Sequence, residues 1–402
     1  MLRFLSLALL VSSAFGADVR ARIRETLFVP DPLPPLASEV HGRFEADPRV
    51  EALRVTYATQ LGMRVPAILY LPKPLPAGKI PALIVVNGHG GDKYSWYAFY
   101  SGILYARGGA AVLSYDPIGE GERNAERKSG TRAHDKVEAP EELGRRMGGL
   151  MMTDVMQAVS YLRSRPEIDP ARIGAMGYSM GSFVLSLACA VEPRLKACVL
   201  VGGGNLDGPD GYWDGAKPMC QGLPYQSLRF LGDRPAELYR LHAQRGPTLI
   251  FNGSEDTVVA IPRMGPAFFD DLRRRTVALL GRSKGIFEVG TVPKASHRPY
   301  FVTAPVAKWL ERHLDFPNWS QADVGELPVT RIGDWAKANG VEMDRLYASE
   351  EREGGTPALG AEVPGLTRQQ LSVFDPGEWE SAKDKLIYER WMEEARKQLR
   401  AR

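Results

Sequence analysis

Three motifs in this sequence carry side chains that together can perform acyl transfer through a nucleophile. The first spans Gly177 to Gly181 in the pattern G-x-S-x-G, with Ser179 at its centre, directly after an apolar run. A serine hydroxyl needs a base to remove its proton, and a sharp turn from a strand into a helix exposes that hydroxyl beside the positive end of the helix dipole. Short strings of this kind also occur as plain loops. The position between a predicted strand and a predicted helix favours Ser179 as the nucleophile.

An acid and a histidine follow Ser179 in the chain order that a nucleophile on such a turn requires. Asp256 comes just after one predicted strand, and His297 comes after the next. Glu255 is a rival to Asp256, but the G-x-x-D spacing from Gly253 favours Asp256. We therefore expect His297 to act as general base toward Ser179, with Asp256 orienting its ring.

A glycine-rich loop, Asn87-Gly88-His89-Gly90-Gly91, is expected to complete the site. Acyl transfer needs two donors for the negative charge that develops on the carbonyl oxygen, and the backbone N–H of Met180 is expected to be the first. The second is expected from the N–H of His89, with Gly90 as second choice; a plain glycine turn is the alternative. No cofactor is predicted, and no metal, because no second ligand lies at metal-binding sequence spacing from His89.

These motifs must be held in place by a sheet. Apolar runs without polar alternation are typical of strands buried on both faces, and here they alternate with segments of helical length. Such alternation predicts an α/β fold with a mostly parallel sheet flanked by helices, in which the chemistry lies at the C-terminal ends of the strands. The expected strands are 50–59, 65–71, 82–86, 110–115, 172–176, 197–201, 248–251 and 285–290. The expected helices are 94–107, 150–165, 179–190, 265–280 and 303–314.

An insertion at about residues 203–246 separates two predicted strands and is too long for a bare connection. We expect it to form a helical cap over the site. Tyr212 and Trp213 within it are candidates for an aromatic wall that binds substrate, and an equally open interpretation is that they only hold the cap together. Tyr178, inside the serine motif, is the third candidate substrate-binding residue.

Residues 1–16 have the pattern of a cleaved secretory signal peptide. Arg3 precedes an apolar run from Phe4 to Val11, and small residues follow. The run is shorter than the roughly 18 residues that a membrane anchor needs. We therefore expect cleavage before Ala17, a secreted or periplasmic protein, and no membrane attachment after cleavage.

From Asp315 onward the alternation of strands and helices stops. Residues 17–314 are therefore predicted to form the catalytic domain and residues 315–402 a C-terminal extension. The extension has 17 acidic and 12 basic side chains, a net charge of −5, against +8 for the residues before it. Opposite charge favours docking of the extension on the body. Its last segment, 381–402, has apolar residues at helical spacing and is predicted to be a helix packed on the body.

The overall composition excludes other classes of protein. A net charge of +3 on 402 residues is too small for electrostatic binding to nucleic acid, and 44% hydrophobic with 25% charged residues excludes wholesale disorder. Three cysteines can close at most one disulfide. Cys189 and Cys198 lie in predicted core elements, so we expect small buried thiols there rather than a bridge.

These motifs, together with the segment Tyr115 to Arg123, resemble the α/β-hydrolase superfamily and, within it, the acetylxylan-esterase-like and dienelactone-hydrolase-like branch. The resemblance runs from about Val50 to Leu314. It implies an α/β-hydrolase fold and a small-molecule or carbohydrate ester as substrate, because members of this branch usually hydrolyse esters of short acyl groups, commonly acetyl groups on sugars. The stretch 116–123 borders the active site in such relatives. A glycine-rich turn with solvated charges is the alternative interpretation, and no catalytic role is assigned to the stretch.

We therefore expect an exported serine carboxylesterase that works through an acyl-enzyme. A peptidase of the prolyl-oligopeptidase type shares the catalytic fold and is one alternative, distinguished by cleavage of prolyl or aminoacyl amides. A catalytically idle carbohydrate-binding protein on the same scaffold is the other. It predicts that a fluorophosphonate probe fails to label Ser179.

Overall fold

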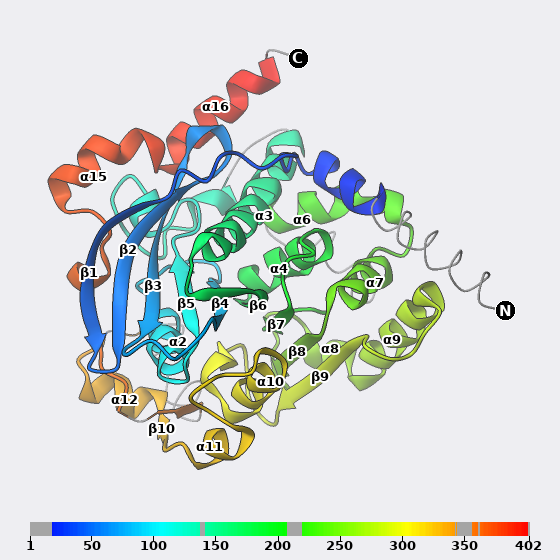
Figure 1. Ribbon diagram of the computed structural model, residues 1–402. Coiled ribbons are helices and arrows are strands. Elements are labelled where there is room, and N and C mark those ends of the chain that lie inside the picture. The colour runs from blue at the N-terminus through cyan, green and yellow to red at the C-terminus, as the bar shows by residue number, and fades with distance from the viewer. Residues whose placement is uncertain are drawn as a thin grey trace.

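Figure 1 shows the structure, a computed structural model in which residues 18–136, 141–206, 219–341, 343, 356–360 and 362–400 are described. A nine-stranded sheet forms its centre, and helices cover both faces. The predicted signal peptide, residues 1–16, lies outside the described residues. None of the described helices is both long enough and apolar enough to cross a lipid bilayer.

The central sheet is mixed, with a parallel core and an antiparallel edge. Its order is β1-β2-β3-β5-β4-β6-β7-β8-β9. β1, β2, β3 and β5 pair antiparallel, and all pairs from β5 to β9 are parallel. The predicted α/β fold with a mostly parallel sheet is confirmed. The strands are β1 (Glu39–Asp47), β2 (Val50–Ala58), β3 (Arg64–Pro72), β4 (Ile80–Val86), β5 (Ala111–Tyr115), β6 (Ile168–Tyr178), β7 (Ala197–Val201), β8 (Thr248–Gly253) and β9 (Phe287–Val292).

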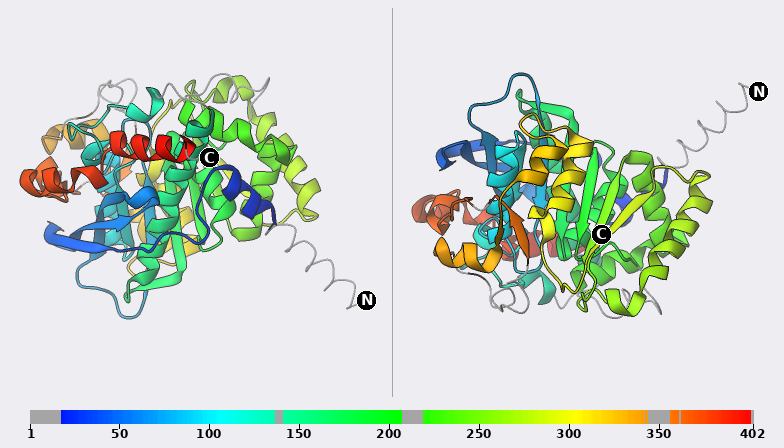
Figure 2. Two further views of the ribbon diagram at one scale, coloured as in Figure 1. Left: turned by 90° about the horizontal axis from the view of Figure 1, so that it is seen from above. Right: turned by 90° about the horizontal axis from the view of Figure 1, so that it is seen from below.

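Helices form two layers, one on each face of the sheet, as the views of Figure 2 show. In β4, Ile84 and Val86 face the apolar core that contains α3, α4, α7 and α9, whereas Leu83 and Val85 face the core that contains α2 and α10. Successive side chains of a strand point to opposite faces, so a strand covered on both sides needs the uninterrupted apolar run that β4 has. The helices of the body are α2 (Trp96–Arg107), α3 (Glu141–Ser164), α4 (Met180–Val191), α6 (Met219–Gln226), α7 (Arg234–Arg245), α8 (Ile261–Met264), α9 (Pro266–Leu280) and α10 (Ala304–Leu314).

Strand β1 was not predicted from the sequence. Most of its side chains are exposed or half-buried, because it is the edge strand and pairs only with β2. A strand at the edge of a sheet lacks the apolar run that marks a central one. His41, which the sequence placed before the sheet, lies in this strand.

The segment predicted as a cap forms no separate cap in its described part. α7 packs against α4 and α9, so it is a crossover helix of the body between β7 and β8. α6 packs against α3. Glycines on α3 allow this close approach: a Cβ at Gly144 would lie 2.5 Å from Leu223, and one at Gly148 would lie 2.5 Å from Pro224. Tyr212 and Trp213 lie outside the described residues.

The C-terminal extension wraps around the β1 edge of the sheet. Trp335 packs on Trp96 and Tyr100 of α2, with ring centroids 6.3 and 4.9 Å away, whereas Trp391 is buried in the core on the opposite face. Between them, the ring of Phe374 lies 4.7 Å from that of His41 on β1. The extension, coloured gold to red in Figure 1, contains α11 (Gln321–Glu326), β10 (Val329–Arg331), α12 (Ile332–Ala338), β11 (Pro357–Leu359), α14 (Arg368–Leu371), α15 (Pro376–Ala382) and α16 (Tyr388–Arg400).

The predicted terminal helix on the body is therefore confirmed. Its position is fixed by buried aromatic and apolar side chains more than by the opposite charges that the sequence suggested. α16 buries Trp391, Met392 and Ala395, spaced at one helical turn, against the core that α3 also faces.

A buried charge also anchors the extension. The Glu122 carboxylate accepts hydrogen bonds from the backbone N–H groups of Val373 at 2.9 Å and Phe374 at 3.0 Å, and it pairs with Lys93 Nζ at 2.8 Å. Burial alone would raise the pKa of Glu122, but the Lys93 charge and these hydrogen bonds hold it below its ordinary value. The alternative of solvated charges in the 116–123 turn is excluded, because its charged side chains are buried: Asp116, Glu122 and Arg123 form ion pairs, and Glu120 accepts backbone N–H groups.

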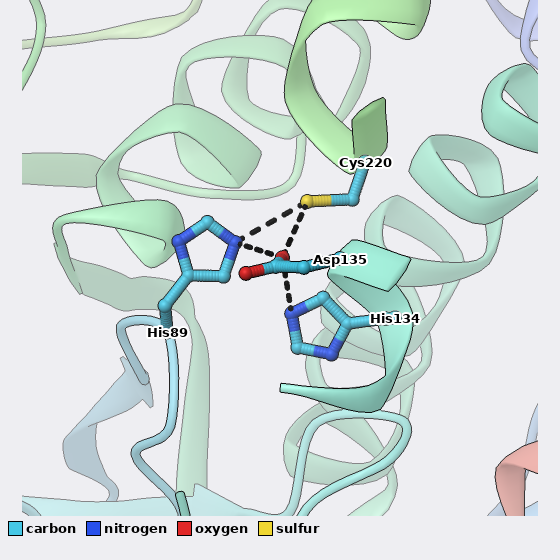
Figure 3. A group of neighbouring side chains, drawn as sticks. All are labelled: His89, His134, Asp135 and Cys220. Atoms are coloured by element: carbon cyan, nitrogen blue, oxygen red, sulfur yellow. Dashed lines mark hydrogen bonds and ion pairs between the residues drawn. The ribbon is translucent and has the colours of Figure 1, made fainter. Parts of the chain in front are cut away.

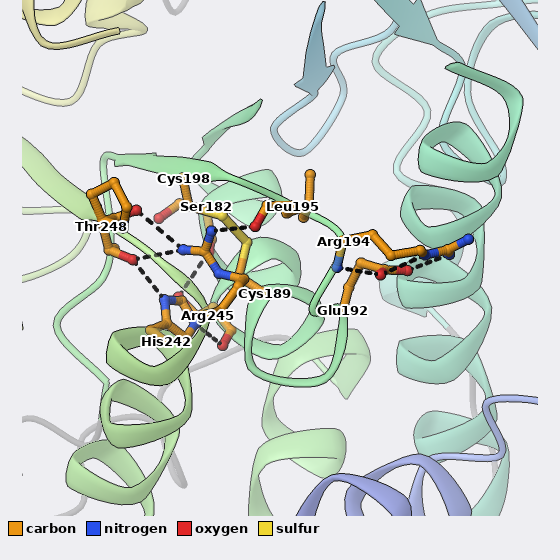
Figure 4. Close-up of a disulfide and its surroundings, with 11 residues drawn as sticks. Ser182, Cys189, Glu192, Arg194, Leu195, Cys198, His242, Arg245 and Thr248 are labelled. Atoms are coloured by element: carbon orange, nitrogen blue, oxygen red, sulfur yellow. Dashed lines mark hydrogen bonds and ion pairs between the residues drawn. A yellow bond between two sulfur atoms is a disulfide. The ribbon is translucent and has the colours of Figure 1, made fainter. Parts of the chain in front are cut away.

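Cys189 of α4 and Cys198 of β7 are joined by a disulfide (Figure 4). The expectation of two buried thiols was wrong. The chain turns directly from the end of α4 into β7, so the two cysteines lie close together although they are nine residues apart in sequence. The third cysteine, Cys220, is free and buried.

Replacing Trp335 with alanine should lower the free energy of unfolding by about 3–5 kcal/mol, because a large ring is removed from a packed site. Urea unfolding followed by circular dichroism measures the change. Val329→Ala, in the same extension but 58% exposed, should change stability by less than about 0.5 kcal/mol. Equal stability of the two variants would contradict the anchoring role of Trp335.

Thiol counting tests the disulfide. The denatured chain should have one reactive thiol before reduction and three afterwards. The matched variant Cys220→Ser should have none before reduction, because its two cysteines are bridged. Three reactive thiols in the unreduced wild-type chain would disprove the bridge.

Candidate active site

Ser179 lies at the turn where β6 ends and α4 begins. Its backbone has φ 53° and ψ −113°, a strained combination that costs a non-glycine residue about 1–3 kcal/mol. The Ser179 N–H donates to the carbonyl of Val201 at 2.9 Å, which ties the turn to the end of β7. The residue is partly exposed between buried neighbours. The turn thus presents a serine hydroxyl at the N-terminus of a helix, as the sequence predicts.

The two glycines of the motif are required by close backbone contacts. A Cβ at Gly177 would lie 2.3 Å from the carbonyl oxygen of Gly181, and a Cβ at Gly181 would lie 2.1 Å from that of Val86. Neither distance is compatible with a side chain, because the clashing atoms belong to the backbone. The G-x-S-x-G spacing therefore follows from how tightly the turn packs on β4.

His297 and Asp256 form a buried pair. Nδ1 of His297 lies 2.7 Å from Oδ2 of Asp256, whose other oxygen accepts the N–H of Val259 at 3.2 Å. The carboxylate accepts, so Nδ1 carries the hydrogen and Nε2 has a free lone pair; among the described residues Nε2 has no hydrogen-bond partner. Asp256 is fully buried, whereas Glu255 is exposed. The structure places Asp256, and not its neighbour, on the histidine.

Glycines at the strand ends let the histidine loop approach the serine turn. A Cβ at Gly253, after β8, would lie 2.2 Å from the carbonyl oxygen of Ala295. A Cβ at Gly202, after β7, would lie 2.8 Å from Cε1 of His297, and one at Gly203 would lie 3.9 Å from the backbone oxygen of Ser179. The loops that follow β6, β7 and β8 therefore meet at one edge of the sheet, where parallel strands place their ligands.

Tyr178 does not line a substrate site. Its side chain is fully buried, its ring centroid lies 4.9 Å from that of His297, and its hydroxyl donates to the carbonyl of His297 at 3.3 Å. It is the last residue of a central strand, and its side chain points into the α2 core. The prediction of Tyr178 as substrate-binding was wrong; it supports the histidine loop from beneath.

The predicted oxyanion loop lies against the serine. A Cβ at Gly88 would lie 3.2 Å from Cβ of Ser179, and the Gly88 N–H donates to the hydroxyl of Tyr97 at 3.2 Å. Gly90 has φ +77° and its carbonyl accepts the N–H of Gly130 at 3.0 Å. The glycine-rich loop after β4 therefore contacts the serine turn at Gly88.

The side chain of His89 belongs to a polar cluster that the sequence did not reveal. His89, His134, Asp135 and Cys220 place one nitrogen, oxygen or sulfur atom each within 4.8 Å of one another (Figure 3). The sequence shows no second ligand at metal-binding spacing from His89, and spacing alone cannot show this cluster, because residues 89, 134 and 220 are far apart in the chain. The adjacent His134-Asp135 pair was the available signal in a chain with six histidines.

Two family models match overlapping parts of the chain. A family model for the prolyl oligopeptidase family matches residues 140–321, and one for acetyl xylan esterase (AXE1) matches residues 39–201. The hydrolase ORFZ of Pyricularia oryzae is 30% identical over 177 residues, which are 42% of this chain and 36% of that protein. The chain spans less than half the length of the first curated relatives that it matches.

Solved structures share the fold. The methylesterase BT1017 superposes with a TM-score of 0.62 and 19% identity over 96% of this chain and 76% of its own. Acetyl xylan esterase 1 from Thermoanaerobacterium sp. JW/SL YS485 superposes with a TM-score of 0.50 and 18% identity over 75% of this chain and 94% of its own.

A pair of neighbouring substitutions tests the Asp256–His297 contact. Asp256→Asn should lower kcat for an activated ester by about 10⁴-fold, because an amide stabilises the wrong histidine tautomer. Glu255→Gln, at the exposed neighbouring position, should retain wild-type kcat. Steady-state kinetics with p-nitrophenyl acetate measure both. If only Glu255→Gln lost kcat, the acid that orients His297 would be Glu255 and not Asp256.

Proposed function

Because the chain is a hydrolase of the α/β-hydrolase superfamily, we propose that it is a carboxylic ester hydrolase that forms an acyl-enzyme on Ser179. One observation carries the proposal: the Asp256–His297 pair, joined by a 2.7 Å contact, lies against residue 202, the neighbour of Val201, whose carbonyl accepts the N–H of the strained Ser179. A hydroxyl after β6, an acid after β8 and a base after β9, at the C-terminal edge of one sheet, are the parts that acyl transfer needs.

The proposed reaction begins when Nε2 of His297 takes the proton of the Ser179 hydroxyl as its oxygen attacks the ester carbonyl. The negative charge on the carbonyl oxygen is then held by the N–H of Met180 and by that of His89, or of Gly90. His297 gives its proton to the departing alcohol, which leaves an acyl-serine. Water, deprotonated by His297, attacks the acyl group, and Ser179 takes back a proton as the acid leaves.

Asp256 has a positioning role in this scheme. It holds the Nδ1–H tautomer of His297 and stabilises the imidazolium that forms in each half-reaction. Its second oxygen is fixed by the N–H of Val259, so the carboxylate cannot rotate without losing a hydrogen bond. The strain at Ser179 keeps the nucleophile in one orientation before substrate arrives.

The proposed substrate is an ester with a short acyl group, most simply acetyl, and a carbohydrate is the proposed alcohol part. Two named similarities support this class: the acetyl xylan esterase model that matches residues 39–201, and the fold shared with an acetyl xylan esterase. The methylesterase that aligns over 96% of the chain suggests the reverse arrangement, a small alcohol on a larger acid. Both arrangements fit the same acyl-enzyme chemistry.

A serine peptidase is the second candidate function. The prolyl oligopeptidase family model supports it, because its match to residues 140–321 includes Ser179, Asp256 and His297. Ester and amide hydrolysis use the same catalytic groups. They differ in the leaving group, because an amide nitrogen must be protonated before it departs, whereas the alcohol of an ester depends less on protonation. Rates on prolyl amides that equal those on esters would favour the peptidase.

We further propose that the protein is exported. The signal-like pattern in residues 1–16 supports this, and so does the disulfide between Cys189 and Cys198, because disulfides persist mainly outside the reducing cytosol. N-terminal sequencing of the protein recovered from culture medium or periplasm, with Ala17 as the expected first residue, tests the proposal.

Ser179→Ala should lower kcat for p-nitrophenyl acetate by about 10⁴–10⁶-fold while the fold is retained. Ser182→Ala is the matched control, since its hydroxyl is buried one turn later in α4 and has no hydrogen-bond partner among the described residues. It should keep wild-type activity. Undiminished turnover by Ser179→Ala would exclude the serine mechanism.

A substrate panel separates the remaining alternatives. Acetylated xylan, acetylated monosaccharides, methyl esters of uronic acids, feruloyl esters and prolyl p-nitroanilides should be compared by kcat/KM on the same preparation. The acetylated sugars are expected to lead. Labelling of Ser179 by a fluorophosphonate probe is expected as well, and a folded chain that the probe does not label would indicate an idle binding protein.

A further inference from the structure

Four ligand-type side chains from three separate segments converge beside the His89 loop. His89 comes from the loop after β4, His134 and Asp135 come from the short helix η3 (Ala133–Lys136), and Cys220 comes from α6. Nε2 of His89 lies 2.7 Å from Oδ1 of Asp135 and 3.2 Å from Sγ of Cys220, which is itself 3.2 Å from the same carboxylate oxygen. Figure 3 shows all four side chains pointing to one centre.

His134 has a free nitrogen directed at that centre. Its Nδ1 lies 3.0 Å from the backbone carbonyl of Ile118, which can only accept, so Nδ1 carries the hydrogen. Nε2 then faces Oδ1 of Asp135 at 3.5 Å with a lone pair, and it has no hydrogen-bond partner among the described residues although the side chain is fully buried. Two lone pairs facing each other in a buried site are unfavourable without a cation between them.

A second nucleophilic triad explains the cluster less well. A Cys–His–Asp relay needs the thiol and the carboxylate on opposite nitrogens of the imidazole, so that a proton can pass through the ring. Here Cys220 and Asp135 both lie at Nε2 of His89. The four ligand atoms surround one centre and do not form the linear order of a relay. This arrangement is typical of a metal-binding site.

We propose that His89, His134, Asp135 and Cys220 bind one divalent zinc ion. Two imidazole nitrogens, one carboxylate oxygen and one sulfur are a donor set typical of zinc. Zinc bond lengths of about 2.0–2.3 Å put the ligand atoms of a tetrahedral site about 3.3–3.6 Å apart. Four of the six distances between ligand atoms are 2.7 to 3.5 Å, and all six are within 4.8 Å. Binding of one ion therefore requires the His89 and His134 rings, whose planes differ by 16°, to rotate toward a common centre.

The surroundings of the cluster fit a built site. The second oxygen of Asp135 is held by Arg132, with Nε at 2.6 Å, which leaves the first oxygen free to bind as a single ligand. Hydrogen bonding of His134 Nδ1 to a backbone carbonyl is the usual way in which a metal-bound histidine is oriented. The Glu120 carboxylate accepts the N–H groups of Thr131 at 3.1 Å and Arg132 at 2.7 Å, and so fixes the start of η3.

Zinc at this position would join three segments that are distant in sequence. It would tie the His89 loop to η3 and to α6, and so fix the backbone of the loop that lies against Ser179. We assign the ion a structural role there. The site does not depend on the proposed esterase function, because its evidence lies wholly in the four ligands and their partners.

The test measures metal directly in full-length protein without an affinity tag. Protein purified without chelator should contain about one zinc per chain by plasma mass spectrometry, and stripped protein should bind added Zn²⁺ at one site by calorimetry. Cys220→Ser and His134→Ala should each weaken binding by at least about 100-fold. His41→Ala, a histidine on β1 outside the cluster, is the control and should bind as wild type.

Cobalt reports whether sulfur is a ligand. Stripped wild-type protein loaded with Co²⁺ should show a thiolate-to-cobalt charge-transfer band, which should be absent in Cys220→Ser. If the variants fail to fold, a measurement on the wild-type protein still tests whether zinc binds at Cys220. Cys220 is its only free thiol, so Zn²⁺ should slow its reaction with Ellman's reagent and a chelator should restore it. The proposal would be overturned if the wild-type protein bound no zinc and Zn²⁺ did not protect its thiol.

Discussion

The close backbone approach at the C-terminal ends of β4, β6, β7 and β8 is the constraint on which the rest of the structure depends. Ser179 adopts a strained backbone because the turn packs directly on the end of β4, where the carbonyl of Val86 leaves no room for a side chain at residue 181. The same approach brings His297 over residue 202 and the His89 loop against the serine. A site built on rigid strand ends is held to tolerances that loops alone do not provide.

Stability for this arrangement comes from both faces of the sheet and from its edge. The C-terminal extension covers the β1 edge and reaches both helical layers, with Trp335 in one core and Trp391 in the other. Its backbone is held by Glu122, a carboxylate that Lys93 keeps charged inside the protein.

Much of the central sheet could be predicted from sequence, because strands buried on both faces leave an uninterrupted apolar run, as in β4 and β7. The positions of Ser179, Asp256 and His297 at strand ends followed from chain order and from glycine spacing. The edge strand β1, the buried pairing of Glu122 with Lys93 and the Cys189–Cys198 bridge could not be predicted, because each depends on contacts between segments whose mutual position a single sequence does not reveal. The cluster around His89 was missed for the same reason. Tyr178 was misassigned because its side chain packs beneath the histidine loop. The local sequence does not show whether the last side chain of a strand points to the substrate or into the core.

The central claim is that the strained serine at the end of β6 carries the acyl group. Its most direct test is peptide mapping by mass spectrometry after rapid acid quench of the enzyme mixed with a slowly turned-over aryl ester. One acyl adduct per chain is expected, on the peptide that contains Ser179. An adduct on Cys220, or turnover with no covalent adduct under conditions in which a burst of the phenol is observed, would contradict it.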